Sequence, residues 1–264
     1  MTLNDVIDKS VAKKVLLLNH SPARLAVRAI LAGVYLTLGT AFAAHMGDKV
    51  EALAPGLGGP VFAMLFFVGL AAIILLGAEL TTSNMMYMCF GLYRRVISAK
   101  NATIILLLST VFNLIGALIV GFLLSRSHVF AHMTDTHLAA EILSHKLDKD
   151  PVGWIIEGIV ANFVVNMGII GALLLKDYLA KFCMLLFVIA IFVGLGTEHV
   201  IANFSLTSIV GFASSPLPEL FTSAQIGQNW LFAWIGNLIG GGVFMGLGYA
   251  WLNAGPDGYV DHIQ

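Results

Sequence analysis

Long apolar stretches alternate with short polar connections along the chain, and they predict six membrane-spanning segments. These segments cover residues 29–47, 61–93, 102–125, 152–175, 179–213 and 230–252. The segments 102–125 and 230–252 contain no Asp, Glu, Lys or Arg, and about 20 apolar residues suffice to cross a hydrocarbon core. We therefore expect an all-α membrane protein whose six transmembrane helices occupy residues 29–252.

The two ends of the chain are expected to lie at one membrane surface. Residues 1–28 carry several basic side chains, and apolar residues recur there at helical spacing, which predicts an amphipathic helix. Residues 253–264 form a short tail. Placing both ends in the cytoplasm puts ten Lys and Arg residues inside and four outside. This distribution favours cytoplasmic N- and C-termini.

Two of the predicted spans, the second and the fifth, are too long for a simple crossing, and related polar sequences interrupt them. The second span reads GAELTTSN at 77–84, and the fifth reads GTEHVIAN at 196–203. The next helix in each half then carries NLIG, at 113–116 and at 237–240. Because each half has an odd number of spans, the second half must cross in the opposite direction. The sequence predicts an aquaporin-like inverted repeat with broken helices two and five.

Paired interruptions in the two halves of a membrane protein point to a substrate site at the interface between the repeats. A glutamate in hydrocarbon is costly and needs partners, so we expect Glu79 and Glu198 to hold the broken loops by accepting N–H groups of the half-helices. Thr82 and His199 would then face the pore, where an imidazole donates or accepts protons near neutral pH. Asn162 and Asn237 are further candidates for a polar lining, and interhelical hydrogen bonding is the alternative.

The composition excludes several classes of protein. Charged residues make up 11% of the chain, whereas soluble proteins carry about a quarter. With 14 basic and 15 acidic residues, no positive excess is present to bind nucleic acid. Two histidines, His128 and His132, make a zinc site conceivable in the loop 126–151, but a solvated loop is the favoured interpretation. We expect no metal, no cofactor and, with both cysteines in apolar segments, no disulfide.

Other membrane functions lack their sequence signatures. A water or glycerol channel would have a similar fold, but neither Asn84 nor Asn203 is followed by proline, so the paired Asn-Pro-Ala motifs are absent. A rhomboid-type protease would need a Gly-x-Ser-Gly nucleophile with a histidine partner. A bis-histidine haem protein would need two intramembrane histidines, and only one lies near the middle of a span. The chain is therefore not expected to be an enzyme.

The segments AELTTSN at 78–84, EHVIAN at 198–203 and IGNLIGGG at 235–242 resemble the formate/nitrite transporter family, and the resemblance extends from about residue 25 to 252. It implies an aquaporin-like protomer, a homopentamer with one pore in each protomer, and a place in the plasma (inner) membrane of a bacterium. It also implies passage of small monovalent weak-acid anions such as formate, nitrite, acetate or lactate. Hydrosulfide is the alternative substrate within the family.

The resemblance implies specific site residues. The functional threonine of the family corresponds to Thr82 and the central histidine to His199. The vestibule lysine corresponds to Lys146, for which a surface position in the charged run 146–150 is the alternative. Conserved pore asparagines of the family correspond to Asn162 and Asn237. The hydrophobic constrictions fall on Phe66, Leu70 and Leu80 on one side of the centre and on Val165 and Phe192 around it.

Two departures from the family pattern bear on substrate size. Thr81 stands where the family usually has Phe, and Thr197 stands where an aromatic residue is common. Both changes are expected to widen or wet the pore, which would admit a larger monocarboxylate such as lactate.

The expected mechanism couples the anion to a proton. Lys146 attracts the anion by its field, and desolvation in the apolar slot raises the proton affinity of the anion. A proton then arrives from water or through His199, and the neutral acid crosses. The competing mechanism is electrogenic passage of the anion past a protonated His199.

Overall fold

The computed structural model describes residues 2–254, which are helical apart from short connections. Helix α1 (Leu3–His20) begins at a capping box in which Thr2 and Asp5 bond each other's backbone N–H groups. Helix α2 (Pro22–Leu53) follows at once, because proline is suited to the first turn of a new helix. The N-terminal helix therefore ends before residue 28, and the first span starts earlier than the hydrophobic pattern indicated.

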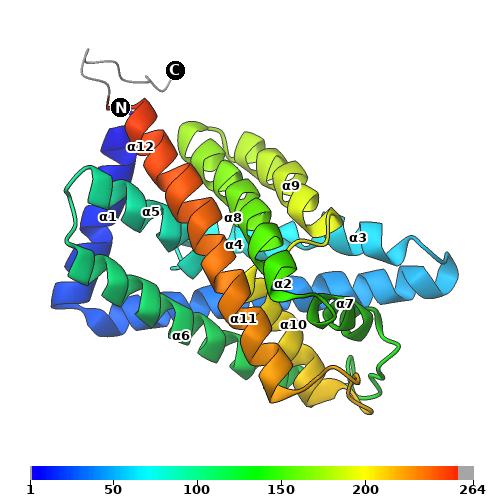
Figure 1. Ribbon diagram of the computed structural model, residues 1–264. Helices are drawn as coiled ribbons and strands as arrows, with labels where there is room; N and C mark the ends of the chain where they lie inside the picture. The colour runs from blue at the N-terminus through cyan, green and yellow to red at the C-terminus, as the bar shows by residue number, and fades with distance from the viewer. Residues whose placement is uncertain (1, 255–264) are drawn as a thin grey trace.

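The remaining helices reproduce the predicted spans, and one further helix, Leu138–Leu147, lies in the stretch 126–151 (Figure 1). The expectation of a solvated loop is wrong for this part of the stretch, because apolar side chains such as Leu143 are buried there. The remaining helices are α3 (Gly58–Leu65), α4 (Phe67–Leu76), α5 (Thr81–Tyr93), α6 (Ala99–Ser125), α7 (Leu138–Leu147), α8 (Pro151–Leu174), α9 (Tyr178–Gly194), α10 (Val200–Ala213), α11 (Ser223–Asn237), the π-helix η1 (Leu238–Leu247) and α12 (Gly248–Leu252). In the described residues, five stretches are long and apolar enough to cross a membrane by length and composition. The remaining predicted span is divided between the shorter apolar helices α9 and α10.

Both predicted interruptions are present, and each begins at a glycine. Gly77 ends α4 with φ 68°, and Gly196 follows α9 with φ 67°. These angles lie in the left-handed region that glycine adopts without a steric penalty. Helices α5 and α10 begin a few residues later and continue in a new direction. The broken helices two and five of the inverted repeat are thus built in the same way.

The sixth span differs from a regular α-helix. Residues 238–247 form wide π-helical turns rather than the α-helix that the apolar pattern predicted. This segment contains Gly240, Gly241 and Gly242, and a Cβ atom on Gly240 would lie 2.1 Å from the carbonyl oxygen of Ile159 on α8. Close backbone approach at small residues is how membrane helices pack without a hydrophobic driving force.

The same kind of contact joins the first and third helices of the first half. A Cβ atom on Gly33 of α2 would lie 2.0 Å from the carbonyl oxygen of Asn113 on α6. A Cβ atom on Gly116 would lie 2.2 Å from the carbonyl oxygen of Ile30. These two glycines therefore allow α2 and α6 to cross in backbone contact.

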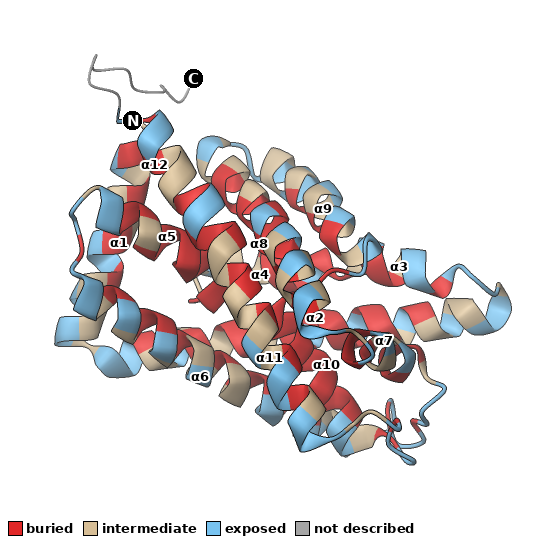
Figure 2. Cartoon of the chain, in the orientation of Figure 1, coloured by how far each residue is buried: buried red, intermediate tan, exposed pale blue. Residues whose placement is uncertain are grey.

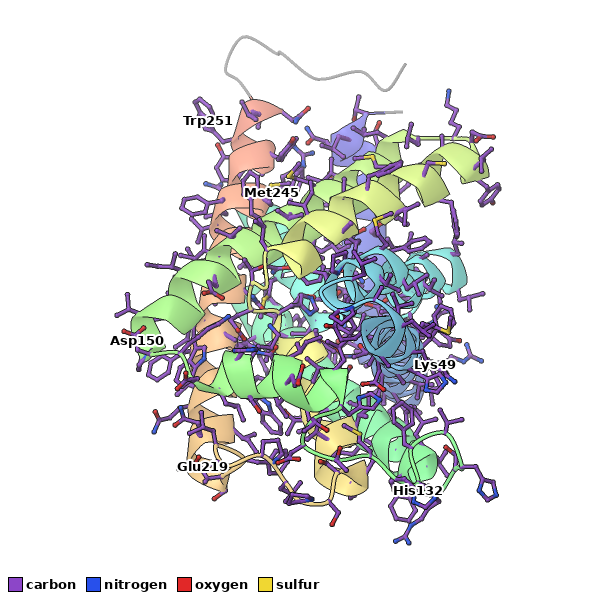
Figure 3. The ribbon with its side chains drawn as sticks, turned by 90° about the vertical axis from the view of Figure 1, so that its right-hand side faces the viewer. Lys49, His132, Asp150, Glu219, Met245 and Trp251 are labelled. Carbon is purple, nitrogen blue, oxygen red and sulfur yellow. The ribbon has the colours of Figure 1, made fainter. Side chains whose placement is uncertain are left out.

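The buried residues lie mainly on the faces that the helices turn toward one another (Figure 2), and many large apolar side chains are exposed on the outside of the bundle. Leu107, Leu123 and Phe187 are more than half exposed, as expected for surfaces that meet lipid. Glu219 and His132 lie at one end of the bundle, and Trp251 lies at the other (Figure 3).

The start of α1 and the end of α12 lie side by side. The side-chain amide of Asn4 donates to the carbonyl of Asn253 at 2.8 Å, so the described chain begins and ends on the same side of the bundle, as an even number of crossings requires. Most of the predicted C-terminal tail, residues 255–264, lies outside the described residues.

Candidate functional site

Two asparagines related by the repeat brace the two broken loops. The Oδ1 atom of Asn237 accepts from the backbone N–H of Val200 at 2.8 Å, and its Nδ2 donates to the carbonyls of Glu198 at 2.7 Å and Gly158 at 2.9 Å. Asn113 repeats this pattern in the first half. It accepts from the N–H of Thr81 at 2.9 Å and donates to the carbonyls of Glu79 at 3.0 Å and Ala29 at 2.7 Å.

The glutamates bond side chains instead of the backbone N–H groups that were predicted as their partners. Glu79 pairs with the ammonium group of Lys14 from α1. Glu198 accepts through one oxygen from Lys146 at 3.3 Å and Lys149 at 2.8 Å, and through the other from Asn203 at 2.7 Å and Asn229 at 3.1 Å.

The prediction that the glutamates accept the N–H groups of the half-helices is therefore wrong, because the asparagine braces do this. The reason is chemical. An amide donates and accepts at once, so it bonds an N–H and a C=O together. A carboxylate only accepts, and in a low-dielectric interior it needs a cation or several donors. Glu79 and Glu198 consequently tie the loops to lysines on other elements.

Thr82 and His199 meet at the centre of the protomer. The Oγ1 atom of Thr82 lies 2.8 Å from Nε2 of His199, and both residues are buried. The Nδ1 atom of His199 accepts from the backbone N–H of Ala202 at 3.1 Å, which caps α10. Since Nδ1 is the acceptor, the hydrogen of the neutral ring sits on Nε2. His199 thus donates to Thr82, and the threonine hydroxyl keeps its own proton free to donate.

Two asparagines of α8 fix the backbone behind this pair. The Nδ2 atom of Asn162 donates to the carbonyl of Thr82 at 3.1 Å and to that of Asn237 at 2.8 Å. Asn166 donates in turn to the carbonyl of Asn162 at 2.8 Å. Asn162 and Asn237, both expected to line the pore, therefore bond backbone groups, as in the alternative of interhelical hydrogen bonding.

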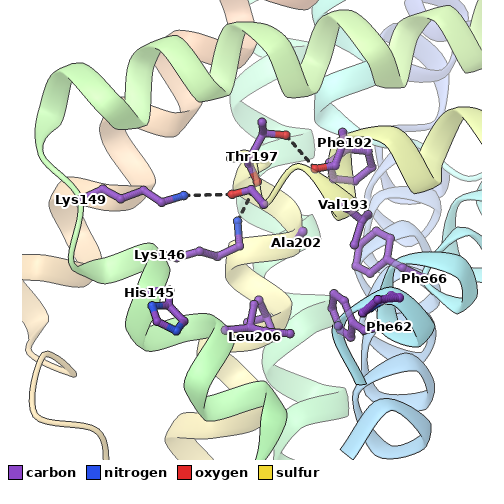
Figure 4. A pocket seen from close by; sticks show the side chains of 15 residues that line it. Phe62, Phe66, His145, Lys146, Lys149, Phe192, Val193, Thr197, Ala202 and Leu206 are labelled. Carbon is purple, nitrogen blue, oxygen red and sulfur yellow. Dashed lines mark hydrogen bonds between the residues drawn. The ribbon is translucent and has the colours of Figure 1, made fainter. Parts of the chain in front are cut away.

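A cavity of about 470 Å³ opens between α3, α7, α9 and α10, and we name it the Lys146 vestibule (Figure 4). Lys146 donates to the carbonyl of Thr197 at 2.8 Å and is only 8% exposed, so it is not the surface lysine of the alternative interpretation. Phe66 and Phe192 also line the vestibule. Their rings meet edge to face at 5.7 Å, and Phe192 lies 5.7 Å from the ring of His199.

A second cavity of about 260 Å³ lies on the side of α1, and we name it the Lys14 vestibule. Lys14, Glu79 and Leu80 line it. Leu80 and Phe66 therefore border different vestibules, and their predicted grouping on one side of the centre is wrong. Leu80 lies beyond the bend at Gly77, and the bend carries it to the opposite side. Leu70 and Val165 are buried and line neither vestibule.

The two unusual threonines occupy different surroundings. Thr81 is fully buried and is not among the residues that line either vestibule. Thr197 lines the Lys146 vestibule, and its hydroxyl donates to the carbonyl of Phe192 at 2.9 Å.

Among residues 2–254, no three His, Cys, Asp or Glu side chains are placed to hold a metal ion. In the histidine-containing loop, His137 caps α7.

The two lysines beside Glu198 differ in their electrostatic surroundings. Burial lowers the pKa of Lys146 below the ordinary lysine value, although Glu198 opposes this effect. Burial acts on Lys149 in the same direction, but the carboxylates of Glu198 and Glu157 outweigh it and hold the pKa of Lys149 above its ordinary value. An adjacent opposite charge favours the charged form of an amine. Lys149 is therefore the more firmly charged of the two.

Sequence reasoning missed Lys14, Lys149 and Asn229 as partners of the loop glutamates. None of these residues belongs to a repeated motif, so the sequence carried no signal for them. The bracing role of Asn113 had a signal in the repeated NLIG.

The comparisons with known proteins agree over nearly the whole chain. A family model described as formate/nitrite transporter matches residues 2–251. The uncharacterized transporter YrhG of Bacillus subtilis is 33% identical over 229 residues, covering 85% of this chain and 83% of that protein. The nitrite transporter NirC of Escherichia coli is 30% identical over 230 residues, covering 87% and 84%. The formate channel BtFdhC of Bacillus thuringiensis is 28% identical over 237 residues, covering 86% of each.

Solved structures show the same fold. A chain described as an FNT family ion channel superposes with a TM-score of 0.87 at 27% identity, covering 94% of this chain and 97% of that one. A pentameric formate channel with formate bound has a TM-score of 0.67 at 22% identity, covering 91% and 96%, and supports the fold alone. Because the family model and these relatives span almost all of its residues, the chain belongs to the formate/nitrite transporter family of membrane transporters and channels.

Proposed function

We propose that the protein is a channel for small monovalent weak-acid anions, with formate and nitrite as its substrates, and that each anion crosses together with a proton. The observation that carries the proposal is the His199–Thr82 pair, which lies between two vestibules that each contain a buried lysine. Phe192 borders His199 on the side of Lys146, and Phe66 packs against Phe192. The names of two relatives, a nitrite transporter and a formate channel, support the same substrate class.

The apolar constriction favours a neutral permeant. A naked anion in such surroundings has lost its hydration and is strongly disfavoured. The field of Lys146 draws the anion into the vestibule, and desolvation then raises its proton affinity. Once protonated, the acid meets the free hydroxyl hydrogen of Thr82, which donates to one of its oxygens.

His199 acts in this proposal as a neutral hydrogen-bond donor. A doubly protonated ring would have to give up the acceptor role of Nδ1 toward Ala202, which would leave the first turn of α10 without its cap. The buried position of the ring also disfavours its charged form. The proton therefore comes from water, and electrogenic passage beside a charged His199 is disfavoured.

Formate and nitrite are proposed ahead of lactate because two relatives are named as a nitrite transporter and a formate channel. Of the two replacements expected to widen the pore, Thr197 lines the Lys146 vestibule, whereas Thr81 is fully buried. The assembly belongs to the same proposal. A homopentamer is supported by the likeness of the fold to a pentameric formate channel. A place in the plasma membrane is supported by the exposed apolar faces, and cytoplasmic N- and C-termini are supported by the excess of Lys and Arg on the side of α1.

The experiment that tests this proposal compares wild type with His199→Asn. Asparagine keeps an oxygen near the place of Nδ1, where it accepts from Ala202, and it has no group that takes up or releases a proton near neutral pH. Formate uptake and proton uptake are measured together in proteoliposomes. We expect the ratio of one proton per formate to survive in His199→Asn, with a reduced rate. Loss of proton uptake while formate uptake persists would show that His199 itself delivers the proton.

A further inference from the structure

Two lysines that line the Lys146 vestibule, Lys146 and Lys149 (Figure 4), share one buried oxygen of Glu198. Lys149 donates to Oε1 of Glu198 at 2.8 Å, and Lys146 donates to the same atom at 3.3 Å. Lys149 also donates to the carbonyl of Gly196 at 2.9 Å and to Oε2 of Glu157 at 2.5 Å. Neither Lys149 nor Glu157 has a role in the proposed function.

The donor count separates the two lysines. An ammonium group has three N–H donors. Lys149 directs them at three acceptors, from Glu157, Gly196 and Glu198. Lys146 has two acceptors, the carbonyl of Thr197 and Glu198, so one N–H remains for a ligand in the cavity that it lines.

The charges lead to the same distinction. The formal charges of the cluster add up to zero, since it contains two lysines and two glutamates: Lys146, Lys149, Glu157 and Glu198. The Glu198 side chain is fully buried, whereas those of Lys149 and Glu157 are 23% and 32% exposed. If Lys146 alone faced Glu198, the pair would be neutral and would attract an anion weakly. With the shorter contact from Lys149 balancing Glu198, the charge of Lys146 remains available to the anion.

We propose that Lys149 is a positioning residue for anion entry, which neutralises Glu198 so that Lys146 can bind the incoming anion, and that Glu157 limits the positive charge of the vestibule. This inference rests on the proposed function, since it assumes that an anion enters at Lys146. Lys149 and Glu157 form one ion pair, and the inference assigns them opposite effects on anion entry.

The predicted changes follow from the vestibule charge. Lys149→Met gives a net charge of minus one, and Glu157→Gln gives plus one. The double variant returns to zero. Surface fields of this kind change entry rates by at least about tenfold. We therefore expect formate entry to fall about tenfold in Lys149→Met, to rise in Glu157→Gln, and to recover close to the wild-type rate in the double variant.

The experiment measures initial formate influx into proteoliposomes at subsaturating formate. A sulfate salt sets the ionic strength to about 10 mM or about 1 M, where the Debye length is about 30 Å or about 3 Å. The differences among variants should be large at low ionic strength and should shrink severalfold at high ionic strength. Lys49→Met, which removes a lysine outside this cluster (Figure 3), is the matched charge control and should behave as wild type.

Recovery of the formate entry rate in the double variant is the decisive result. If the ion pair were only structural, removing Glu157 as well as Lys149 would not bring the rate back. If the double variant stays as slow as Lys149→Met at both ionic strengths, or if Glu157→Gln slows entry, the inference is overturned. Elution of each variant as the wild-type oligomer shows that it has folded. A wild-type protein that moves neither formate nor nitrite would contradict the proposed function itself. If wild type is active and the two single variants, the double variant and the Lys49→Met control all show the wild-type rate of formate entry, this inference alone is contradicted.

Discussion

Replacing the brace of the second broken loop, Asn237→Leu, should destabilise the protein strongly. Leucine has the same number and branching of side-chain heavy atoms as asparagine but no polar atom. The substitution removes three hydrogen bonds, to Val200, Glu198 and Gly158. The carbonyl of Gly158 lies inside α8 and keeps its helical partner. The N–H of Val200 and the carbonyl of Glu198 lie at the break and are left without a partner.

The magnitude follows from these two groups. A buried polar group that loses its partner costs about 1–3 kcal/mol. Two such groups give about 2–6 kcal/mol of destabilisation. Asn113→Leu should cost a similar amount, because it orphans the N–H of Thr81 and the carbonyl of Glu79 and leaves the helical carbonyl of Ala29 paired. The inverted repeat thus predicts nearly equal losses of stability from Asn113→Leu and Asn237→Leu, although the two residues lie far apart in the sequence.

The assay is thermal unfolding of the purified protein in detergent, with the fraction of folded oligomer followed by size-exclusion chromatography. Both variants should melt well below wild type and by similar amounts. Asn101→Leu is the matched control, because it makes the same replacement on α6 about 18 Å from Asn113 along the helix axis. The reasoning would be refuted if Asn237→Leu melted with wild type, or if the control fell as far as the two brace variants.

Three further results are expected. Lys14→Met leaves Glu79 as a buried charge without its cation, which costs about 3–5 kcal/mol of stability, and the double variant Lys14→Met/Glu79→Gln should recover part of that loss. The rate of trypsin cleavage within α1 measures the effect in both variants. Equal cleavage of Lys14→Met and wild type would contradict the role of the pair. Gly33→Ala would place a methyl group 2.0 Å from a backbone oxygen of α6, so the yield of folded oligomer should collapse, whereas Gly59→Ala, with open space around it, should express as wild type. Thr82→Val removes the hydroxyl that donates to substrate, so formate uptake should fall about 5- to 150-fold for a loss of about 1–3 kcal/mol. The variant should also melt below wild type, because the buried Nε2–H of His199 loses its acceptor. Uptake at the wild-type rate would show that Thr82 is not a substrate contact.

The fold was predictable because its strongest signals are local. Apolar stretches marked the spans, and glycine two residues before each loop glutamate marked the breaks. Gly77 and Gly196 indeed adopt left-handed angles there. Spacing between motifs also indicated the repeat, and the repeated NLIG pointed to Asn113 and Asn237 as equivalent residues.

The partners of polar groups were less predictable, because they depend on contacts between distant segments. Lys14 lies 65 residues before Glu79, and Lys149 lies 49 residues before Glu198. No periodicity links such pairs. The glutamates therefore looked like helix caps in the sequence, although in the structure they bind cations that other helices supply.

The constriction residues show the same limit. Their apolar character was evident, but the side of the centre on which each one lies depends on the bend at Gly77. Leu80 falls beyond that bend and borders the Lys14 vestibule, while Phe66 falls before it and borders the Lys146 vestibule. The family resemblance therefore gave the wrong side for Leu80.

The most direct test of the central claim is the uptake of labelled formate, nitrite and lactate into proteoliposomes with the membrane potential clamped, at an acidic and at a neutral external pH. The account predicts that formate and nitrite uptake rises at acidic pH, because more of each anion is protonated at the constriction, and that it does not follow the potential. Uptake accompanied by a current that follows the clamped potential would contradict passage as the neutral acid.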